Sequence, residues 1–239
     1  MKALVALIAL TTIAMPANAQ DIAISLGEEN ALTARTLQLI ALITVLSLAP
    51  GLAIMITCFP FIVTVLSILR QAIGLQQSPP NMLIVSLALF LTYFVMEPVF
   101  ASAWQNGLSP LVEGTMDMNT AFRETMAPFQ VFMGARVDPE TLDAMIDMRP
   151  QAAEISAEEP PLSVLVPAFL LSEISRAFQI GFLVFLPFLI IDMVVAAILM
   201  SMGMMMVPPA VVALPFKLAF FVVADGWTLV TSALVRSYF

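Results

Sequence analysis

The sequence predicts an all-α integral membrane protein, and three observations predict it: an excess of apolar residues, a shortage of charge, and long apolar runs of helical length. Of the 239 residues, 61% are hydrophobic and only 11% are charged, and the mean hydropathy is +1.00. Soluble domains carry about 25% charged residues. A soluble fold of this length would therefore lack the polar side chains needed to cover its surface.

The first 19 residues have the pattern of a cleavable signal peptide. Lys2 is followed by an apolar stretch from Ala3 to Ile13, and residues 17–19 read Ala-Asn-Ala. The apolar core is too short to span a bilayer, and Ala-x-Ala is the usual cleavage site. Cleavage would leave residues 20–36 as an extracytoplasmic N-terminal segment; the alternative is an uncleaved membrane anchor.

Residues 37–100 predict a first helical hairpin. The run Leu37–Leu69 is longer than the roughly 20 residues that one span needs, and Pro50, Gly51 and Pro60 divide it. Because proline removes a backbone donor and clashes with the preceding turn, we expect kinks or a broken helix at these residues. A polar turn over 71–81 then leads into a second apolar run, Met82–Phe100, which contains Glu97.

Residues 101–161 differ in composition and predict an acidic extracytoplasmic region with helices. They hold ten acidic and three basic residues, a local net charge of −7. Asp138 followed by Pro139 and the sequence ETLDAMID predicts an N-cap, a proline at the first helical position and a short helix that ends before Pro150.

Residues 162–239 predict a second hairpin. Three apolar stretches cover 162–171, 177–202 and 210–235; Pro187 lies within the second, and Pro208-Pro209 turns the chain before the third. The apolar stretches of the whole chain fit about four kinked passes through the membrane, arranged as helical hairpins. A translocated N-terminus then places the C-terminus outside as well, with cytoplasmic turns at 71–81 and near 200–209.

The composition also excludes several kinds of chemistry. The chain has no histidine and one cysteine, Cys58. This removes histidine-dependent catalysis, histidine metal sites, thiol pairs and an internal disulfide. The net charge of −8 argues against a nucleic-acid partner. We expect no cofactor and no metal.

Charged residues inside the apolar stretches are candidates for contacts between helices or subunits, since each is costly in lipid unless it is paired or hydrated. Glu173 and Arg176 stand three residues apart on one helix face and can pair locally. We hypothesise that Asp192 pairs with Lys217 between helices or subunits, whereas Lys217 and Asp225 are too far apart on one helix to touch. A structural ion-pair network and a proton or ion relay both fit this pattern.

A cluster of methionines is the most unusual local feature. Five occur within seven residues, just before Pro208-Pro209: Met200, Met202, Met204, Met205 and Met206. Methionine is flexible and fills irregular gaps, so lipid-facing or core packing is one interpretation. The other is a deformable apolar constriction that closes a pore around varied cargo.

Several longer motifs together resemble the FliP family of flagellar export proteins. They are AFQIGF at 177–182, PFLIID at 187–192, MGMMM at 202–206, LPFKL at 214–218 and DGW at 225–227, with SPPN at 78–81 and ALFLT at 88–92 upstream. The chain departs from the family at Pro60-Phe61, where a Thr-Arg pair is usual. It also departs after Met133, where a basic stretch is replaced by Gly-Ala-Arg136.

The resemblance implies a pore-forming subunit of the type III export gate in the bacterial inner membrane, at the flagellar basal body. It implies a ring of five copies with FliR- and FliQ-like subunits, next to FlhB- and FlhA-like components. Exported proteins pass through the ring, and Met204, Met205 and Met206 form its gasket, with Met200 and Met202 beside them.

Three other functions are alternatives to this role in export. The gate subunit of a virulence injectisome shares the core motifs. An ion-coupled secondary transporter would use Asp192 and Asp225, but it predicts a repeat symmetry that the unequal halves lack. An intramembrane aspartyl protease needs two carboxylates that share a proton, and neither aspartate has the Gly-x-Gly-Asp setting of such proteases.

Overall fold

A computed structural model describes residues 29–75, 79–150, 156–157 and 160–239, and within these ranges the chain forms helices and no strand. The signal peptide, and most of the N-terminal segment expected to follow it, lie outside the described residues. The chain divides into two units, residues 1–47 and 48–239. Helix α2 (Glu29–Met55) begins in the first unit and ends in the second, and its segment Arg35–Met55 is apolar, exposed and long enough to cross a membrane.

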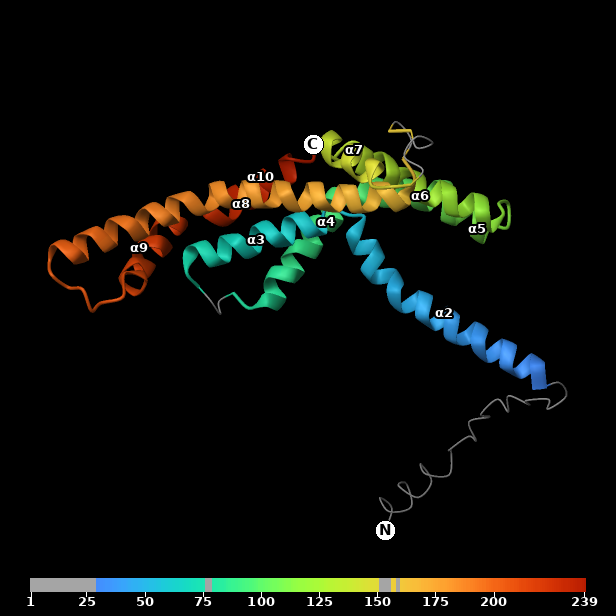
Figure 1. Cartoon of the computed structure of the whole chain (residues 1–239), viewed down its shortest axis with the longest axis horizontal. Helices are drawn as coiled ribbons and strands as arrows, with labels where there is room; N and C mark the ends of the chain where they lie inside the picture. Colours follow the sequence, from blue (N-terminus) through green and yellow to red (C-terminus); the bar gives the residue numbers. More distant parts are fainter. Residues whose placement is uncertain (1–28, 76–78, 151–155, 158–159) are drawn as a thin grey trace, which may run out of the picture. The chain divides into compact units, whose positions relative to one another are not determined.

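Helix α3 (Phe59–Ile73), which is labelled in Figure 1, carries much of the hydrophobic core of the second unit. It begins after a short break at 56–58, with Pro60 in its first turn, where a missing N–H costs nothing. Its buried residues recur every three or four positions, so one face is enclosed: Phe61, Ile62, Val65, Leu66, Leu69, Ala72 and Ile73. Gly74 ends the helix with a φ of 90°.

Helix α4 (Asn81–Ala103) packs against α3, and the two form a hairpin. The helical path continues beyond the expected boundary at residue 100, through a π-helical turn (Trp104–Leu108) into α5 (Ser109–Val112). Gly107 lies in this turn and touches α6: a Cβ there would lie 2.6 Å from the backbone nitrogen of Thr125. Glycine therefore permits the close approach of the two elements.

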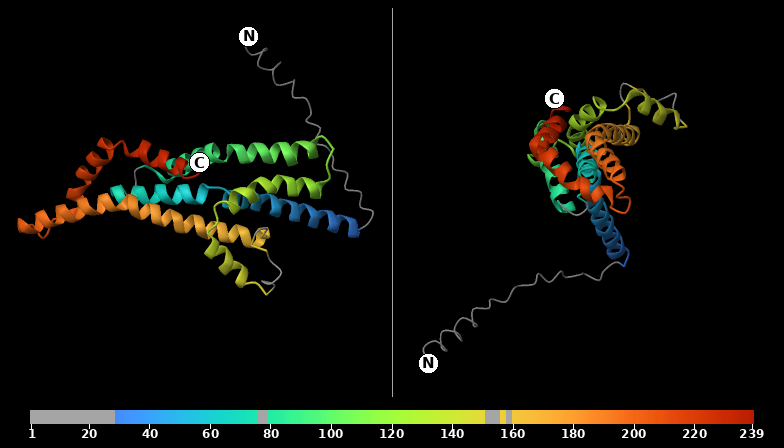
Figure 2. Two further views of the ribbon diagram at one scale, coloured as in Figure 1. Left: turned by 90° about the horizontal axis from the view of Figure 1, so that it is seen from above. Right: turned by 90° about the vertical axis from the view of Figure 1, so that its left-hand side faces the viewer.

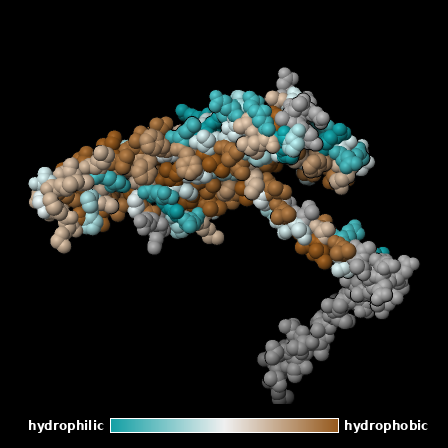
Figure 3. Space-filling model, viewed as in Figure 1, coloured by the Kyte–Doolittle hydropathy of each residue, from teal (hydrophilic) through white to brown (hydrophobic). Residues whose placement is uncertain are grey.

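Helices α6 (Met118–Gly134) and α7 (Pro139–Asp147) both lie in the acidic region. Asp138 caps α7 and Pro139 opens it, which confirms the prediction for this helix. The hydroxyl and the amide of Thr141 both donate to the Asp138 carboxylate. These bonds lower the pKa of Asp138, and the hydroxyl has the larger effect. In the space-filling view the hydrophilic surface gathers over this part of the chain, while hydrophobic surface covers much of α8 and α9 (Figure 3).

Helix α8 (Leu162–Ser201) is a single helix of 40 residues. The sequence suggested a separate stretch ending near Leu171, because Glu173 and Arg176 interrupt the apolar pattern. Both charges have partners, described below, so the helix continues through them. At 1.5 Å per residue α8 is ~60 Å long, about twice the hydrocarbon thickness of a bilayer. It lies beside α3 (Figure 2). A Cβ added at Gly181 would lie 2.4 Å from Ile68 of α3.

Helices α9 (Pro209–Val223) and α10 (Gly226–Arg236) complete the fold. They meet at an angle of 61° around Asp225, whose φ of 48° is uncommon for a residue other than glycine. Together they count as one broken span or a re-entrant loop.

Three described helical segments are long and apolar enough to cross a membrane, or four if α9 and α10 form one span. The predicted all-α membrane fold is confirmed. Among the residues expected as hinges, Pro50 and Pro187 lie inside helices. Pro60, Pro208 and Pro209 instead stand where α3 and α9 begin.

Candidate functional site

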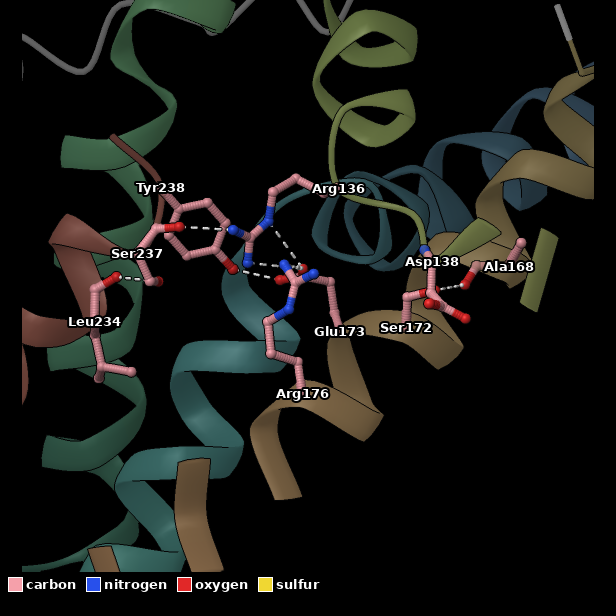
Figure 4. A network of polar contacts seen from close by, with 9 residues as sticks. All are labelled: Arg136, Asp138, Ala168, Ser172, Glu173, Arg176, Leu234, Ser237 and Tyr238. Atoms are coloured by element: carbon pink, nitrogen blue, oxygen red, sulfur yellow. Dashed lines mark hydrogen bonds and ion pairs between the residues drawn. The ribbon is translucent and has the colours of Figure 1, made fainter. Parts of the chain in front are cut away.

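Glu173 is the centre of a buried polar network on α8. Its side chain is fully enclosed, although it lies in an otherwise apolar helix. A carboxylate in such a position needs charged or hydrogen-bonding partners, because its desolvation is costly. Figure 4 shows that these partners converge on Glu173 from elements far apart in the sequence. We call Arg136, Ser172, Glu173, Arg176 and Tyr238 the Glu173 network.

Arg136 supplies the main countercharge. Its Nε and Nη2 donate to Glu173 Oε1 at 3.2 and 3.1 Å, and its Nη1 donates to the carbonyl of Ser237 at 2.7 Å. The guanidinium also lies 4.0 Å from the centre of the Tyr238 ring. Arg136 therefore joins α8 to the segment that follows α10. Arg176, on the more exposed side, stands 3.7 Å from the same Glu173 oxygen.

The connection between α6 and α7 holds Arg136 in place. Helix α6 ends at Gly134, and the amides of Arg136 and Val137 both donate to the Met133 carbonyl. The Asp138 amide donates to Ser172 Oγ at 2.9 Å, and that hydroxyl donates to the Ala168 carbonyl. Two neighbouring residues of α8, Ser172 and Glu173, thus fasten the acidic region to the apolar core.

Tyr238 brings the end of the described chain to the same point. Its hydroxyl donates to Glu173 Oε2, and its ring packs against Phe61 and Phe132. Burial, reinforced by the neighbouring Glu173 carboxylate, raises the pKa of the Tyr238 hydroxyl well above its usual range. The hydroxyl therefore keeps its proton and remains a donor to Glu173.

A second ion pair lies nearer the far end of α8. Lys217 of α9 is buried; its Nζ is 2.6 Å from Asp192 Oδ2 and donates to the Ala72 carbonyl at 3.0 Å. Ala72 is in the last turn of α3, where carbonyls lack helical partners and a cation is favourable. Lys217 thus ties α3, α8 and α9 together. Asp192 Oδ1 is buried and has no hydrogen-bond partner among the described residues.

Two of the embedded charges make no ion pair within the described chain. Asp225 is exposed and stands at the bend between α9 and α10. Glu97 is exposed on α4. The structure thus brings Glu173 together with Arg176, and Asp192 together with Lys217. It pairs neither Glu97 nor Asp225 with another charge of the described chain. Whether any of these charges contacts another subunit stays a prediction.

The methionine cluster forms the loop between α8 and α9. Met200 lies in the last turn of α8, Gly203 turns the chain with a φ of 75°, and α9 starts after Pro208. We call Met202–Val207 the methionine loop. Met205 and Met206 contact little of their own chain, being 83 and 98% exposed, whereas Met204 and Val207 are only 39 and 36% exposed. An exposed apolar loop at the tip of a hairpin is expected to be covered by lipid or by other subunits.

Sequence reasoning missed two members of the Glu173 network. Arg136 was noted only as a departure from a family pattern, and Tyr238 was not singled out; a third member, Ser172, was given no contact. One signal was available: an arginine just before the Asp138-Pro139 helix start is well placed to reach a carboxylate on a neighbouring helix. Nothing in the sequence indicated that this carboxylate is Glu173. No three His, Cys, Asp or Glu side chains in the described ranges gather closely enough to hold a metal ion.

These features define a class: an all-helical membrane protein in which a buried ion network fastens a polar region to long apolar helices, and in which a hairpin presents an uncovered apolar loop. The FliP family matches residues 42–234 of the chain. This range includes α3 through α9 in full, both ion pairs and the methionine loop. The chain belongs to the FliP family.

Individual relatives agree with this assignment. The chain is 52% identical over 215 residues to the flagellar biosynthetic protein FliP of Caulobacter vibrioides, which covers 90% of this chain and 81% of that protein. It is 44% identical to the protein of the same name in Bacillus subtilis, over 85% of this chain and 92% of the relative. It is also 42% identical to the protein of this name in Aquifex aeolicus, over 91% of this chain and 91% of the relative.

Proposed function

We propose that this chain is a pore-forming subunit of the flagellar protein export gate, with the methionine loop as the seal that limits leak. Its family and its apolar helices make it a membrane-embedded component of the flagellar export apparatus. The pore, the seal and the passage of unfolded flagellar proteins are the proposal. In this role the chain is a conduit and not an enzyme.

The exposure of the methionine loop is the observation that carries the proposal. Met202, Met205 and Met206 are 65, 83 and 98% exposed although their side chains are apolar, and Met204 is 39% exposed. Such side chains need a partner surface, and several copies of the same loop around an axis would supply one. Thioether side chains adapt to irregular gaps, so a ring of them can close around different cargo and exclude water and ions.

A ring also accounts for the exposed helices. Large apolar side chains stand uncovered along α4, α8 and α9 in the single chain. Lipid can cover some of this surface. The length of α8 exceeds one bilayer, however, so part of it needs protein neighbours. We assign these neighbours to further copies, five in the ring, together with FliR- and FliQ-like subunits. FlhB- and FlhA-like components complete the apparatus in the inner membrane.

The ion pairs hold the shape of each subunit in this proposal. The Glu173 network fixes the acidic region, which we place on the extracytoplasmic side, to α8. The Asp192–Lys217 pair fixes the hairpin that carries the methionine loop. The signal peptide predicted for residues 1–19 would direct the N-terminus across the membrane, which is consistent with this orientation.

The test is an ion-leak measurement on membrane vesicles that contain the assembled apparatus. Replacing Met204, Met205 and Met206 with alanine should raise the leak without preventing assembly, because smaller side chains cannot close the constriction. Met118→Ala and Met148→Ala are matched controls, since both methionines are exposed but lie in the acidic region. An unchanged leak in the loop variant, with assembled complex present, would refute the seal.

A second candidate is the equivalent gate subunit of a virulence injectisome, whose core motifs are shared. The relatives described above all carry flagellar names, and this favours the flagellar apparatus. An ion-coupled carrier needs a carboxylate that loads and releases an ion. Lys217 holds Asp192 at 2.6 Å, which instead favours a structural pair.

A further inference from the structure

We infer that the outward face of α4 binds a membrane helix of a different protein, and that a lysine or arginine of that helix pairs with Glu97. The inference rests on the proposed function only in taking this chain as one subunit of a membrane assembly. It needs neither the pore nor the seal. It assigns a partner to a carboxylate that has no countercharge within the described chain.

Helix α4 has two different faces. One face packs against α3 and α6 and holds the buried residues of the helix: Ile84, Ala88, Thr92, Val95, Met96 and Ala103. The other face carries Phe90, Phe94, Glu97 and Ala101, at successive spacings of four, three and four residues. This spacing places the four side chains in one stripe along the helix. An apolar stripe of this kind is typical of a helix that packs lengthwise against another helix.

Glu97 is the one charged residue in the candidate membrane span Asn81–Val112. Lipid can cover the aromatic rings of the stripe, but a carboxylate in lipid is costly unless it is paired. The next residue, Pro98, has no N–H, so the Phe94 carbonyl loses the donor that an α-helix normally supplies. Phe94 and Glu97 stand one turn apart on the same face, and both need donors. A lysine or arginine supplies several donors and the opposite charge.

The chain already contains one contact of this kind. Lys217 Nζ lies 2.6 Å from Asp192 Oδ2 and also donates to the Ala72 carbonyl at 3.0 Å. That carbonyl is in the last turn of α3, where helical donors are missing. One lysine thus serves a carboxylate and a helix carbonyl together. We assign the same arrangement to Glu97 and the Phe94 carbonyl, with the cation supplied from outside the chain.

A second copy of this chain is a poor source of that cation. The two basic residues inside long apolar stretches, Arg176 and Lys217, already pair with carboxylates of their own chain. The other basic residues of the apolar helices stand at the ends of apolar segments: Arg35, Arg70 and Arg236. Each added copy also brings another Glu97. Charge complementarity therefore favours a different subunit that carries a basic residue within an apolar helix.

The experiment places a photo-crosslinking amino acid at position 101, one turn beyond Glu97, in the assembled apparatus, and identifies the cross-linked peptide by mass spectrometry. We expect an apolar helix of a different subunit, with a lysine or arginine within two turns of the cross-link. Glu97→Leu should reduce this product about tenfold or more, because the partner's cation is left unpaired. Glu124→Gln, an exposed acidic position on α6, is the control and should leave it unchanged. Cross-links only to lipid, to a second copy of this chain, or to a helix without a basic residue would overturn the inference.

A charge exchange separates this contact from a general effect on folding. Glu97→Lys should lose the cross-link, and replacing the partner's basic residue with glutamate should restore it in the double variant. Glu97→Leu suits lipid better than glutamate does, so a Glu97→Leu chain that keeps its cross-link at the wild-type yield would contradict the inference. If the alanine variants of the methionine loop do not leak but the cross-link forms, the seal fails and this contact stands. The opposite result leaves the seal and removes the contact.

Discussion

Replacing Glu173 with glutamine should destabilise the chain strongly, because it removes the charge at the centre of the Glu173 network. The substitution keeps the size of the side chain and one carbonyl oxygen. It leaves the guanidinium of Arg136, whose side chain is only 14% exposed, without its countercharge. It also weakens the acceptor for the Tyr238 hydroxyl.

The magnitude follows from the burial of the pair. Breaking a buried ion pair by removing one partner costs about 3–5 kcal/mol. Arg136 keeps the Ser237 carbonyl and the Tyr238 ring, so we expect the lower end, ~3 kcal/mol. For a chain of this size, 1 kcal/mol shifts Tm by about 2–4 °C, so the expected decrease is roughly 6–12 °C.

Thermal unfolding of the purified protein in detergent micelles measures this effect. Arg123→Gln is the control, since Arg123 is exposed on α6 and its loss should change the free energy of unfolding by no more than about 0.5 kcal/mol. The double variant Arg136→Gln with Glu173→Gln should lose less stability than the sum of the single variants. A Glu173→Gln protein with the Tm of the wild type, or strictly additive losses, would refute the reasoning.

Three further predictions concern other contacts. Gly107→Ala should cost about 1–3 kcal/mol in unfolding free energy, because its Cβ would clash with the α6 backbone, whereas Gly134→Ala has open space and should be neutral or stabilising. Asp192→Lys or Lys217→Asp alone should reduce assembly in a native-gel assay, and the two together should restore it in part, because an aspartate at position 217 lacks the bond to the Ala72 carbonyl; a double variant as poor as the single ones would contradict a stabilising role for the pair. The Asp138 carboxylate has a lowered pKa, so its cap on α7 is complete above pH 3.8 and is lost as the pH falls through the lower folded-state pKa. The protection factors of the α7 amides, which correct for the intrinsic pH dependence of exchange, should therefore fall in acid in the wild type but not in Asp138→Asn, and an equal fall in both would contradict this assignment.

Much of the fold could be predicted from local patterns. The apolar composition indicated a helical membrane protein, and the Asp138-Pro139 pair marked the start of α7. The element boundaries were harder to predict. Glu173 and Arg176 suggested an end to the apolar stretch, but α8 continues through them because Arg136 compensates the charge from another element. A local pattern cannot show a partner 37 residues away.

In the candidate sites, too, local patterns predicted some contacts and could not predict others. The hypothesis that Asp192 pairs with Lys217 came from the cost of charge in lipid, and the structure places the two side chains in contact. That cost does not reveal the third partner, the Ala72 carbonyl, since backbone groups are the same in every residue. Tyr238 was missed for a related reason: a tyrosine near a chain end has no distinctive pattern until the fold encloses it.

Cysteine cross-linking at position 206 tests the central claim most directly, because a seal requires the loops of several copies to face one another. Met206 is 98% exposed, and the single native cysteine, Cys58, is fully buried, so the wild type provides a low background. In the assembled apparatus, Met206→Cys should form disulfide-linked dimers on mild oxidation, whereas Met148→Cys in the acidic region should not. An intact complex in which Met206→Cys gives no more cross-linked product than the wild type would contradict the proposed pore.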